Sequence, residues 1–307
     1  MGKPALIELE GADGIVRILS GPGMGDRGAE LATAPADFYN TPFEAIYTAH
    51  AYERGSTYNG KRIKSMYPVF SVDIFGTKDR PWEHWDDEWA TALTDDQDAF
   101  LWYTTPTRTS RRKLAVRLVN EMQFKPMRDP RLGEYGRVTM NCIAPDPFWY
   151  EDDSVFDRWR CMVDTTDGHI EWGSVTVSNP TPYPIWLKWR LQDGPAPGVK
   201  WHLPDFSWGN KRYRRAVQDA DRMLILPELL GDEHLDIETD ENTKREPVRS
   251  PKDTQIYLRM DGKAFVYPLR PYLDPVEVPV GVQNAPAGVG VRVECPRPWP
   301  KPWGLRR

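Results

Sequence analysis

Thirteen tryptophans, set among 29 prolines and 23 glycines in 307 residues, restrict the folds open to this chain. Many of the tryptophans stand beside proline or glycine in short phrases such as Asp146-Pro-Phe-Trp-Tyr150, Glu171-Trp-Gly173 and Pro296-Arg-Pro-Trp-Pro-Lys-Pro-Trp-Gly304. Indole rings supply a large buried area per residue, while proline and glycine divide the backbone into short extended pieces. The pattern predicts a multi-stranded β protein with large contact surfaces, rather than a helical enzyme built around a cofactor.

Charge and cysteine content exclude several classes of function. Forty Lys and Arg against 45 Asp and Glu give a net charge of -5, so the chain has no basic field for phosphates and we expect no nucleic-acid specificity. Three cysteines without CxxC spacing, Cys142, Cys161 and Cys295, predict buried free thiols instead of a disulfide framework or a zinc site. The sequence also lacks a signal-peptide pattern and any apolar run long enough for a membrane span.

The first half of the chain contains recognisable strands and one helix. Residues 5–10 and 14–19 predict a hairpin, and the alternation between Phe70 and Ile74 predicts a half-buried strand. Trp82, Trp85, Trp89, Ala92 and Leu93 share one stripe at 3.6 residues per turn, which predicts a helix over 82–93. Three further strands are expected at 100–104, 113–118 and 137–144, the first two joined by a basic loop at 107–112.

Short strands separated by turns recur in the second half, as in a β-sandwich. They are expected at 174–178, 185–191, 223–226, 234–238, 254–260 and 289–294. The pattern of strands and turns changes near residues 145–152, which predicts two domains, 1–148 and 149–307. Prolines at 296, 298, 300 and 302 block one edge of an extended segment and predict an edge strand or polyproline segment.

The motifs of catalysis are weak or absent. Gly23-Met-Gly-Asp-Arg-Gly28 matches G-x-G-x-x-G, but Pro35 soon follows and no second parallel strand does, so a flexible loop is favoured over a dinucleotide site. The five histidines form no metal-ligand pair, and neither a G-x-S-x-G elbow nor a catalytic cysteine signature occurs. We therefore predict no enzyme activity, no cofactor and no metal.

Aromatic and basic residues are the candidates for a protein interface. The helical stripe offers Trp82, Trp85 and Trp89, although packing of this helix on a sheet explains the same stripe and is preferred. The other candidates are Arg108, Arg111 and Arg112 in the basic loop, and Trp299 and Trp303 near the C-terminus.

Several phrases in their order along the chain resemble one known family, the distal tail proteins among the minor tail proteins of actinobacterial siphophages, as in mycobacteriophages. The phrases are Ser20-Gly-Pro-Gly-Met-Gly-Asp-Arg-Gly28, Pro35-Ala-Asp-Phe-Tyr39, Asp73-Ile-Phe-Gly-Thr77, Arg117-Leu118 with Asp129-Pro130, Ala144-Pro-Asp-Pro-Phe-Trp-Tyr150, Asn179-Pro-Thr-Pro-Tyr-Pro-Ile-Trp186, Leu203-Pro-Asp-Phe-Ser-Trp208 and Arg222-Met-Leu-Ile-Leu-Pro227.

The resemblance implies an all-β fold with one or two short helices: an N-terminal ring-forming β-barrel or split-barrel domain and a C-terminal galectin-like β-sandwich. It implies a structural virion protein made in the host cytoplasm and placed at the distal end of a long non-contractile tail. There it forms a hexameric ring between the tail tube and the tail tip or baseplate. Its expected partners are further copies of itself, the major tail tube protein, the tape measure protein, the tail hub and other minor tail proteins, including receptor-binding proteins.

Carbohydrate binding is the alternative function. Val177-Ser-Asn179 matches one sugar-binding piece of galectin-like domains and Trp172-Gly173 resembles another, but Val175 stands where that piece needs Glu, and the His-x-Asn-x-Arg strand is absent. Such a module would recognise host cell-wall glycan. A glycoside hydrolase ranks last because no pair of carboxylates stands out.

Overall fold

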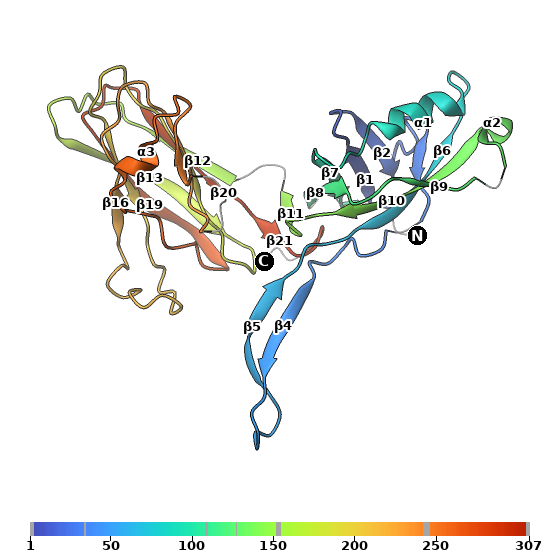
Figure 1. Cartoon of the computed structure of the whole chain (residues 1–307). Helices are drawn as coiled ribbons and strands as arrows, with labels where there is room; N and C mark the ends of the chain where they lie inside the picture. Colours follow the sequence, from blue (N-terminus) through green and yellow to red (C-terminus); the bar gives the residue numbers. More distant parts are fainter. Residues whose placement is uncertain are drawn as a thin grey trace. The chain divides into compact units, whose positions relative to one another are not determined.

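The computed structural model describes residues 3–33, 35–107, 110–126, 128–151, 155–241 and 246–304. Within these ranges the chain is built mainly of antiparallel strands, with three short helices (Figure 1). The predicted all-β class, with a barrel-like and a sandwich part, is confirmed. No helix in the described ranges has the length and apolar character needed to cross a membrane.

Two compact units divide the chain. The first contains residues 1–152 together with 299–305, and the second contains residues 153–298. The C-terminal segment therefore returns to the first unit after the chain has passed through the second. The sequence-based division had placed this segment in the second domain.

The first unit is a nearly closed antiparallel barrel. Its strand order is β2 (Val16–Ser20), β1 (Leu6–Glu10), β7 (Ala99–Thr104), β8 (Arg111–Leu118), β10 (Tyr135–Ile143), β6 (Val69–Phe75), β3 (Ala29–Leu31). The two end strands, β2 and β3, lie close to one another. Three short strands are attached beside this path: β9 (Gln123–Phe124), β11 (Trp149–Glu151) and β21 (Pro298–Trp299).

Alternating burial explains how these strands close over a core. Phe70, Val72 and Ile74 of β6 are buried, as the sequence pattern predicts. Helix α1 (Trp82–Ala90) contacts β6 and brings Trp82 and Trp89 into the same core. The predicted opening hairpin and the predicted 70–74 strand are thus confirmed, and so is the predicted helix, although it ends at Ala90 and not at residue 93. A second helix, α2 (Pro130–Gly133), is a single turn capped by Asp129.

The basic loop between β7 and β8 is shorter than the sequence predicts. Thr104 pairs with Arg111, and Tyr103 pairs with Arg112, so both arginines belong to β8. The loop is short because the β7–β8 ladder continues through these two pairs as far as the turn. Arg108 lies outside the described residues.

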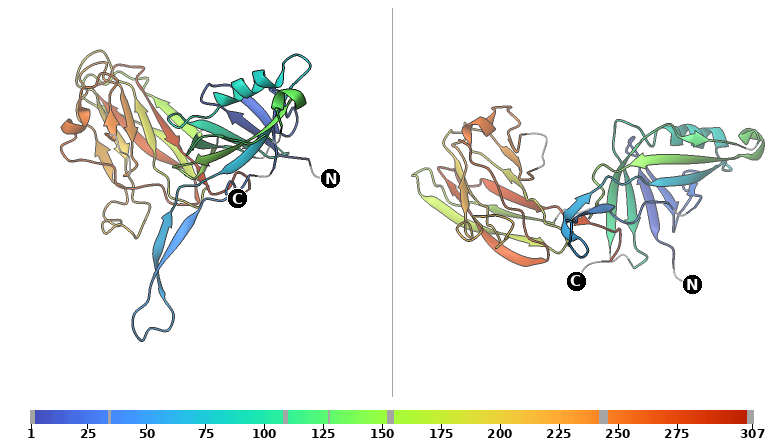
Figure 2. Two further views of the ribbon diagram at one scale, coloured as in Figure 1. Left: turned by 45° about the vertical axis from the view of Figure 1, so that its right-hand side comes forward. Right: turned by 60° about the horizontal axis from the view of Figure 1, so that its bottom comes forward.

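A separate two-stranded hairpin projects from the barrel of the first unit (Figures 1 and 2). It consists of β4 (Phe43–Thr48) and β5 (Thr57–Ile63), which pair with one another and with no other described strand. The sequence did not predict these strands, because residues 29–66 show no clear period.

The second unit is a sandwich of two antiparallel sheets. The five-stranded sheet has the order β12 (Val155–Arg160), β20 (Gly290–Cys295), β14 (Lys188–Leu191), β17 (Leu235–Glu238), β18 (Val248–Arg249). The four-stranded sheet has the order β13 (Ile170–Asn179), β19 (Leu273–Gln283), β15 (Lys200–Pro204), β16 (Met223–Ile225).

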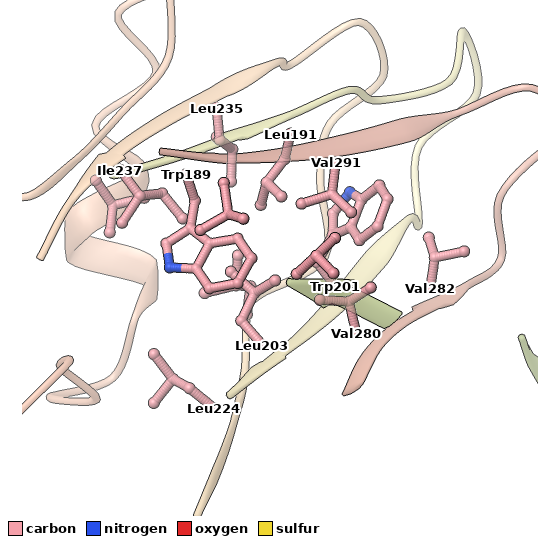
Figure 3. Packing of buried hydrophobic residues seen from close by; sticks show 14 of the residues in the cluster. Trp189, Leu191, Trp201, Leu203, Leu224, Leu235, Ile237, Val280, Val282 and Val291 are labelled. Atoms are coloured by element: carbon pink, nitrogen blue, oxygen red, sulfur yellow. The ribbon is translucent and has the colours of Figure 1, made fainter. Parts of the chain in front are cut away.

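Side chains from both sheets meet in the core of the second unit. Figure 3 shows Trp189, Leu191 and Val291 of one sheet facing Trp201 and Leu203 of the other. All five are buried. The indoles of Trp189 and Trp201 are therefore part of the sandwich core, as expected for aromatic rings, which bury a large apolar area.

One predicted strand of this unit is wrong. Residues 254–260, expected to be extended, contain the one-turn helix α3 (Ile256–Arg259). Its buried side chains are Ile256 and, just after the helix, Met260, and this spacing of four places both on one side of a helical turn.

Candidate assembly interface

The β4–β5 hairpin exposes aromatic and aliphatic side chains on both of its strands. Phe43 is 62% exposed, Ile46 48%, Tyr47 57% and Tyr58 56%. The rings of Tyr47 and Tyr58 contact each other across the ladder with centroids 5.6 Å apart. About half of each of these side chains is thus left in water, and this apolar area stabilises the protein only if another surface covers it.

The hairpin keeps its form through local polar contacts. Lys64 and Glu44 form an ion pair at 2.8 Å near its base, and the amide of Asn59 donates to the hydroxyl of Thr48 at 2.9 Å. Near the tip the backbone N–H of His50 donates to a carboxylate oxygen of Glu53. A lone two-stranded ribbon is marginal in water, so these local contacts add little stability to the β4–β5 hairpin, hereafter called the arm.

The tryptophan helix is used inside the first unit. Trp82 stacks on Phe124 with ring centroids 5.7 Å apart, and Trp89 is buried in the barrel core. Trp85 is half-buried, and its indole N–H donates to the hydroxyl of Thr77 at 3.3 Å. The helix packs on the sheet, as the preferred interpretation of its tryptophan stripe predicts. A role of Trp82, Trp85 and Trp89 in an interface stays a prediction.

A buried arginine fixes the C-terminal end of the same helix. The guanidinium of Arg17 pairs with Asp13 at 2.7 Å and donates to the backbone carbonyl of Glu88 at 2.9 Å. Burial alone would raise the pKa of the Asp13 carboxyl, but the hydrogen bonds from Arg17 and from the backbone outweigh it and lower that pKa. The ion pair orders the Arg17 side chain within the hairpin, and the hydrogen bond from Arg17 to Glu88 holds α1 against the opening hairpin.

Arg111 and Arg112 have opposite environments although they are adjacent. The guanidinium of Arg111 lies 3.9 Å from the ring centroid of Trp102, on a side chain that is 40% exposed. Arg112 is fully buried and lies 4.0 Å from the ring centroid of Trp299. Strand alternation separates them, because successive residues point to opposite faces of a sheet.

The C-terminal segment is held through Arg112 and an aromatic cluster. Two guanidinium nitrogens of Arg112 donate to the backbone carbonyls of Lys301, at 2.7 Å, and Gly304, at 2.9 Å. Trp299 is fully buried, while Trp303 is 37% exposed and packs 5.3 Å from the ring of Tyr103. Trp299 and Arg112 thus build the first unit itself, and an interface role for them and for Trp303 stays a prediction.

The two candidate sugar-binding residues, Asn179 and Trp172, have different environments in the structure. The Asn179 amide is buried and donates to the carbonyls of Tyr183 and Arg270, while its oxygen accepts from Thr181. Every polar atom of this side chain is used to hold a turn. Trp172 is 49% exposed and lies edge-on to His202, with centroids 5.6 Å apart.

The described part of the chain contains no group of three or more His, Cys, Asp or Glu side chains arranged to hold a metal ion. Burial raises the pKa of the Cys142 thiol to about 12, and it also raises the pKa of Cys295. Both are inert rather than nucleophilic thiols, since the reactive form is the thiolate.

Comparisons with known proteins match the whole chain. It is 28% identical to minor tail protein Gp27 of Mycobacterium phage D29 and 27% identical to minor tail protein Gp27 of Mycobacterium phage L5, each over 98% of both chains. No protein-family model matches it.

Solved structures give the same fold at much lower identity. The Dit (gp 19.1) protein of phage SPP1, described as a paradigm of the hub adsorption apparatus in phages that infect Gram-positive hosts, superimposes with a TM-score of 0.54 at 12% identity. That match covers 96% of this chain and 99% of the Dit chain. A chain of the phage P2 baseplate in its activated conformation gives 0.53 at 9% identity, covering 96% and 98%.

The resemblance predicted from the sequence phrases is confirmed by these matches. The chain is similar over nearly its whole length to mycobacteriophage minor tail proteins, and it is folded like the Dit and baseplate proteins of other phages.

Proposed function

We propose that this protein forms a closed ring, of six copies by analogy with the family it resembles, which joins the tail tube to the tail tip. In this position it carries the hub or the receptor-binding proteins, at the distal end of the virion tail. The tail tube, tape measure and hub proteins are its neighbours. The protein acts by assembly and not by catalysis.

The observation that carries the proposal is the β4–β5 hairpin. Its exposed rings, Tyr47, Tyr58 and Phe43, lie on a ribbon that pairs with no other described strand. In a closed ring each copy meets the next through two different surfaces. A projecting arm that packs on the neighbouring copy provides one such surface, and covers the apolar side chains that the single chain leaves in water.

The experiment compares two double variants that each replace two exposed side chains by serine. Tyr47→Ser/Tyr58→Ser removes the paired rings of the arm, whereas Tyr67→Ser/Val119→Ser removes side chains of similar exposure, 55% and 52%, elsewhere on the first unit. Light scattering and negative-stain images are taken of each protein alone and mixed with the tail tube protein, since a ring can require its partner to assemble. Rings should form with the parent and the control and be lost in the arm variant. Loss of rings in neither variant, or in both equally, contradicts the role of the arm.

Carbohydrate binding has a narrower basis in the structure. Of its two candidate residues, Asn179 is occupied within its turn and only Trp172 is exposed. If the sandwich binds a neutral cell-wall glycan through this ring, Trp172→Ala should abolish retention on a glycan array.

A further inference from the structure

A groove of about 650 Å³ crosses the outer face of the five-stranded sheet in the second unit. Four arginines line it, Arg158, Arg160, Arg190 and Arg292, together with a single carboxylate, Asp236. The chain as a whole carries a net charge of -5. With four positive charges and one negative charge, the groove is therefore positively charged although the protein as a whole is negatively charged.

The sheet register brings three of these arginines into one row. Arg158 of β12 is directly opposite Arg292 of β20, and Arg292 is directly opposite Arg190 of β14. Residues directly opposite in an antiparallel ladder have Cβ atoms about 5 Å apart, and like charges at such positions destabilise a sheet. The arrangement costs the fold free energy, which an anion lying along the row would recover.

Only part of this charge is neutralised within the protein. Glu294 lies 3.2 Å from Arg292 and 3.7 Å from Arg190, and Asp236 lies 3.6 Å from Arg190. Arg158 and Arg160 are exposed, and among the described residues their side chains have no carboxylate within ion-pair distance. The unneutralised charge is thus concentrated at the β12 end of the row.

The backbone of β20 borders the groove at Gly290. Gly290 is paired with Arg160, and its backbone carbonyl accepts from the N–H of Gln192, which directly follows β14. A Cβ added at Gly290 would lie 3.2 Å from the Gln192 side chain and from the Trp159 carbonyl, so these groups already fill the space beside the glycine.

Arginine side chains are the recognition groups of this groove, and their row runs across the strands. The volume is that of a site for a small or chain-like ligand, and guanidinium groups match phosphate and carboxylate oxygens with paired hydrogen bonds.

We propose that this groove binds a linear anionic glycan or polyol polymer, and not a peptide, whose repeating units carry phosphate or carboxylate groups, with Arg158 and Arg160 as the main contacts. The inference concerns the second unit alone and does not depend on ring formation. Phosphodiester polymers and uronate polymers share the required chemistry, and binding assays can separate them.

The test measures the affinity of the full chain for four polymers of similar length: poly(glycerol phosphate), polygalacturonate, neutral dextran and poly-glutamate. Arg158→Gln/Arg160→Gln is compared with Arg212→Gln/Arg214→Gln, which removes the same charge from exposed positions elsewhere in the second unit. Far-UV spectra and thermal unfolding verify that both variants are folded.

The expected result is binding of poly(glycerol phosphate), polygalacturonate or both, weakened about tenfold or more in the groove variant and less than about twofold in the control. Preference for one of the two polymers identifies the source of the charge. Binding to neither polymer, equal weakening in both variants, or equally tight binding of dextran overturns the proposal. Equally tight binding of poly-glutamate also overturns it, because the groove would then suit an acidic protein segment.

Discussion

The guanidinium of Arg112 lies 4.0 Å from the centroid of the Trp299 ring, so a residue of β8 and a residue 187 positions later form one buried contact. The same guanidinium donates to the carbonyls of Lys301 and Gly304. The chain leaves the first unit, builds the second and then returns to be fastened at this point. The C-terminal segment is thereby a structural part of the barrel.

Removing this guanidinium should loosen the C-terminal segment. Arg112→Gln leaves two backbone carbonyls without their donor and removes the cation from the Trp299 ring, so the free energy of unfolding should fall by roughly 3 kcal/mol. Urea unfolding measures this change, and limited proteolysis should cut the C-terminal segment first. Arg111→Gln, at the exposed neighbouring position, serves as the control and should cost less than about 1 kcal/mol. Equal effects of the two substitutions would disprove the anchoring role.

A glycine in the sandwich provides the space for an indole. A Cβ at Gly173 of β13 would lie 2.1 Å from the ring of Trp159, which packs against the core of the second unit. Gly173→Ala should therefore displace this ring and cost about 1–3 kcal/mol. Thermal unfolding of this variant is compared with that of Ser174→Ala at the next position, where a change within about 0.5 kcal/mol is expected. A neutral Gly173→Ala would mean that the ring can shift freely.

His202 should make the stability of the sandwich depend on pH. Burial, with a smaller contribution from Lys200, lowers the pKa of its imidazole below the unfolded value of 6.5. Below pH 6.5 the unfolded chain binds a proton that the folded chain does not, so stability falls as pH decreases from 6.5 towards the lowered pKa. One such proton contributes at most about 1.4 kcal/mol per pH unit. Chemical unfolding between pH 7 and 5 should show a shallower slope in His202→Gln; an unchanged slope would contradict this assignment.

The three cysteines should resist modification in the native protein. Cys142, Cys161 and Cys295 are all buried, and burial raises the pKa of Cys142 to about 12. Because the thiolate is the reactive species, a thiol reagent at pH 8 should label none of them within minutes, and all three after unfolding in urea. Rapid labelling of a single thiol without denaturant would place that residue in a more open environment.

Local patterns in the sequence predicted the elements that have one clearly buried face of their own. The alternation of Phe70, Val72 and Ile74 identified β6, and the tryptophan stripe identified α1. Strand β19 escaped prediction because Pro275 and Pro279 interrupt its pattern, yet Pro279 occupies a register position opposite Ser174. The 254–260 segment was misassigned because a single turn of helix is too short for its period to be distinct from that of a strand.

The surfaces to which we assign a role were the hardest features to predict. The β4–β5 hairpin has no buried face in the single chain, so it lacks the alternation by which a strand is recognised. Arg112 could not be separated from Arg111 without the β7–β8 register, and its partner Trp299 is remote in sequence. The arginine groove likewise arises from three strands, and only their register brings Arg158, Arg292 and Arg190 together. The Arg112–Trp299 contact and the arginine groove both depend on pairing between strands that are distant in sequence, which a single sequence does not reveal.

The position of the protein in the virion tests the central claim most directly. Tail particles are imaged by cryo-electron microscopy, and their density is compared with the first unit, whose β4–β5 arm is a recognisable marker. We predict a closed ring at the junction of tube and tip, with each arm packed on the next copy. Density for a single unpartnered copy, or for this fold elsewhere than at that junction, would contradict it.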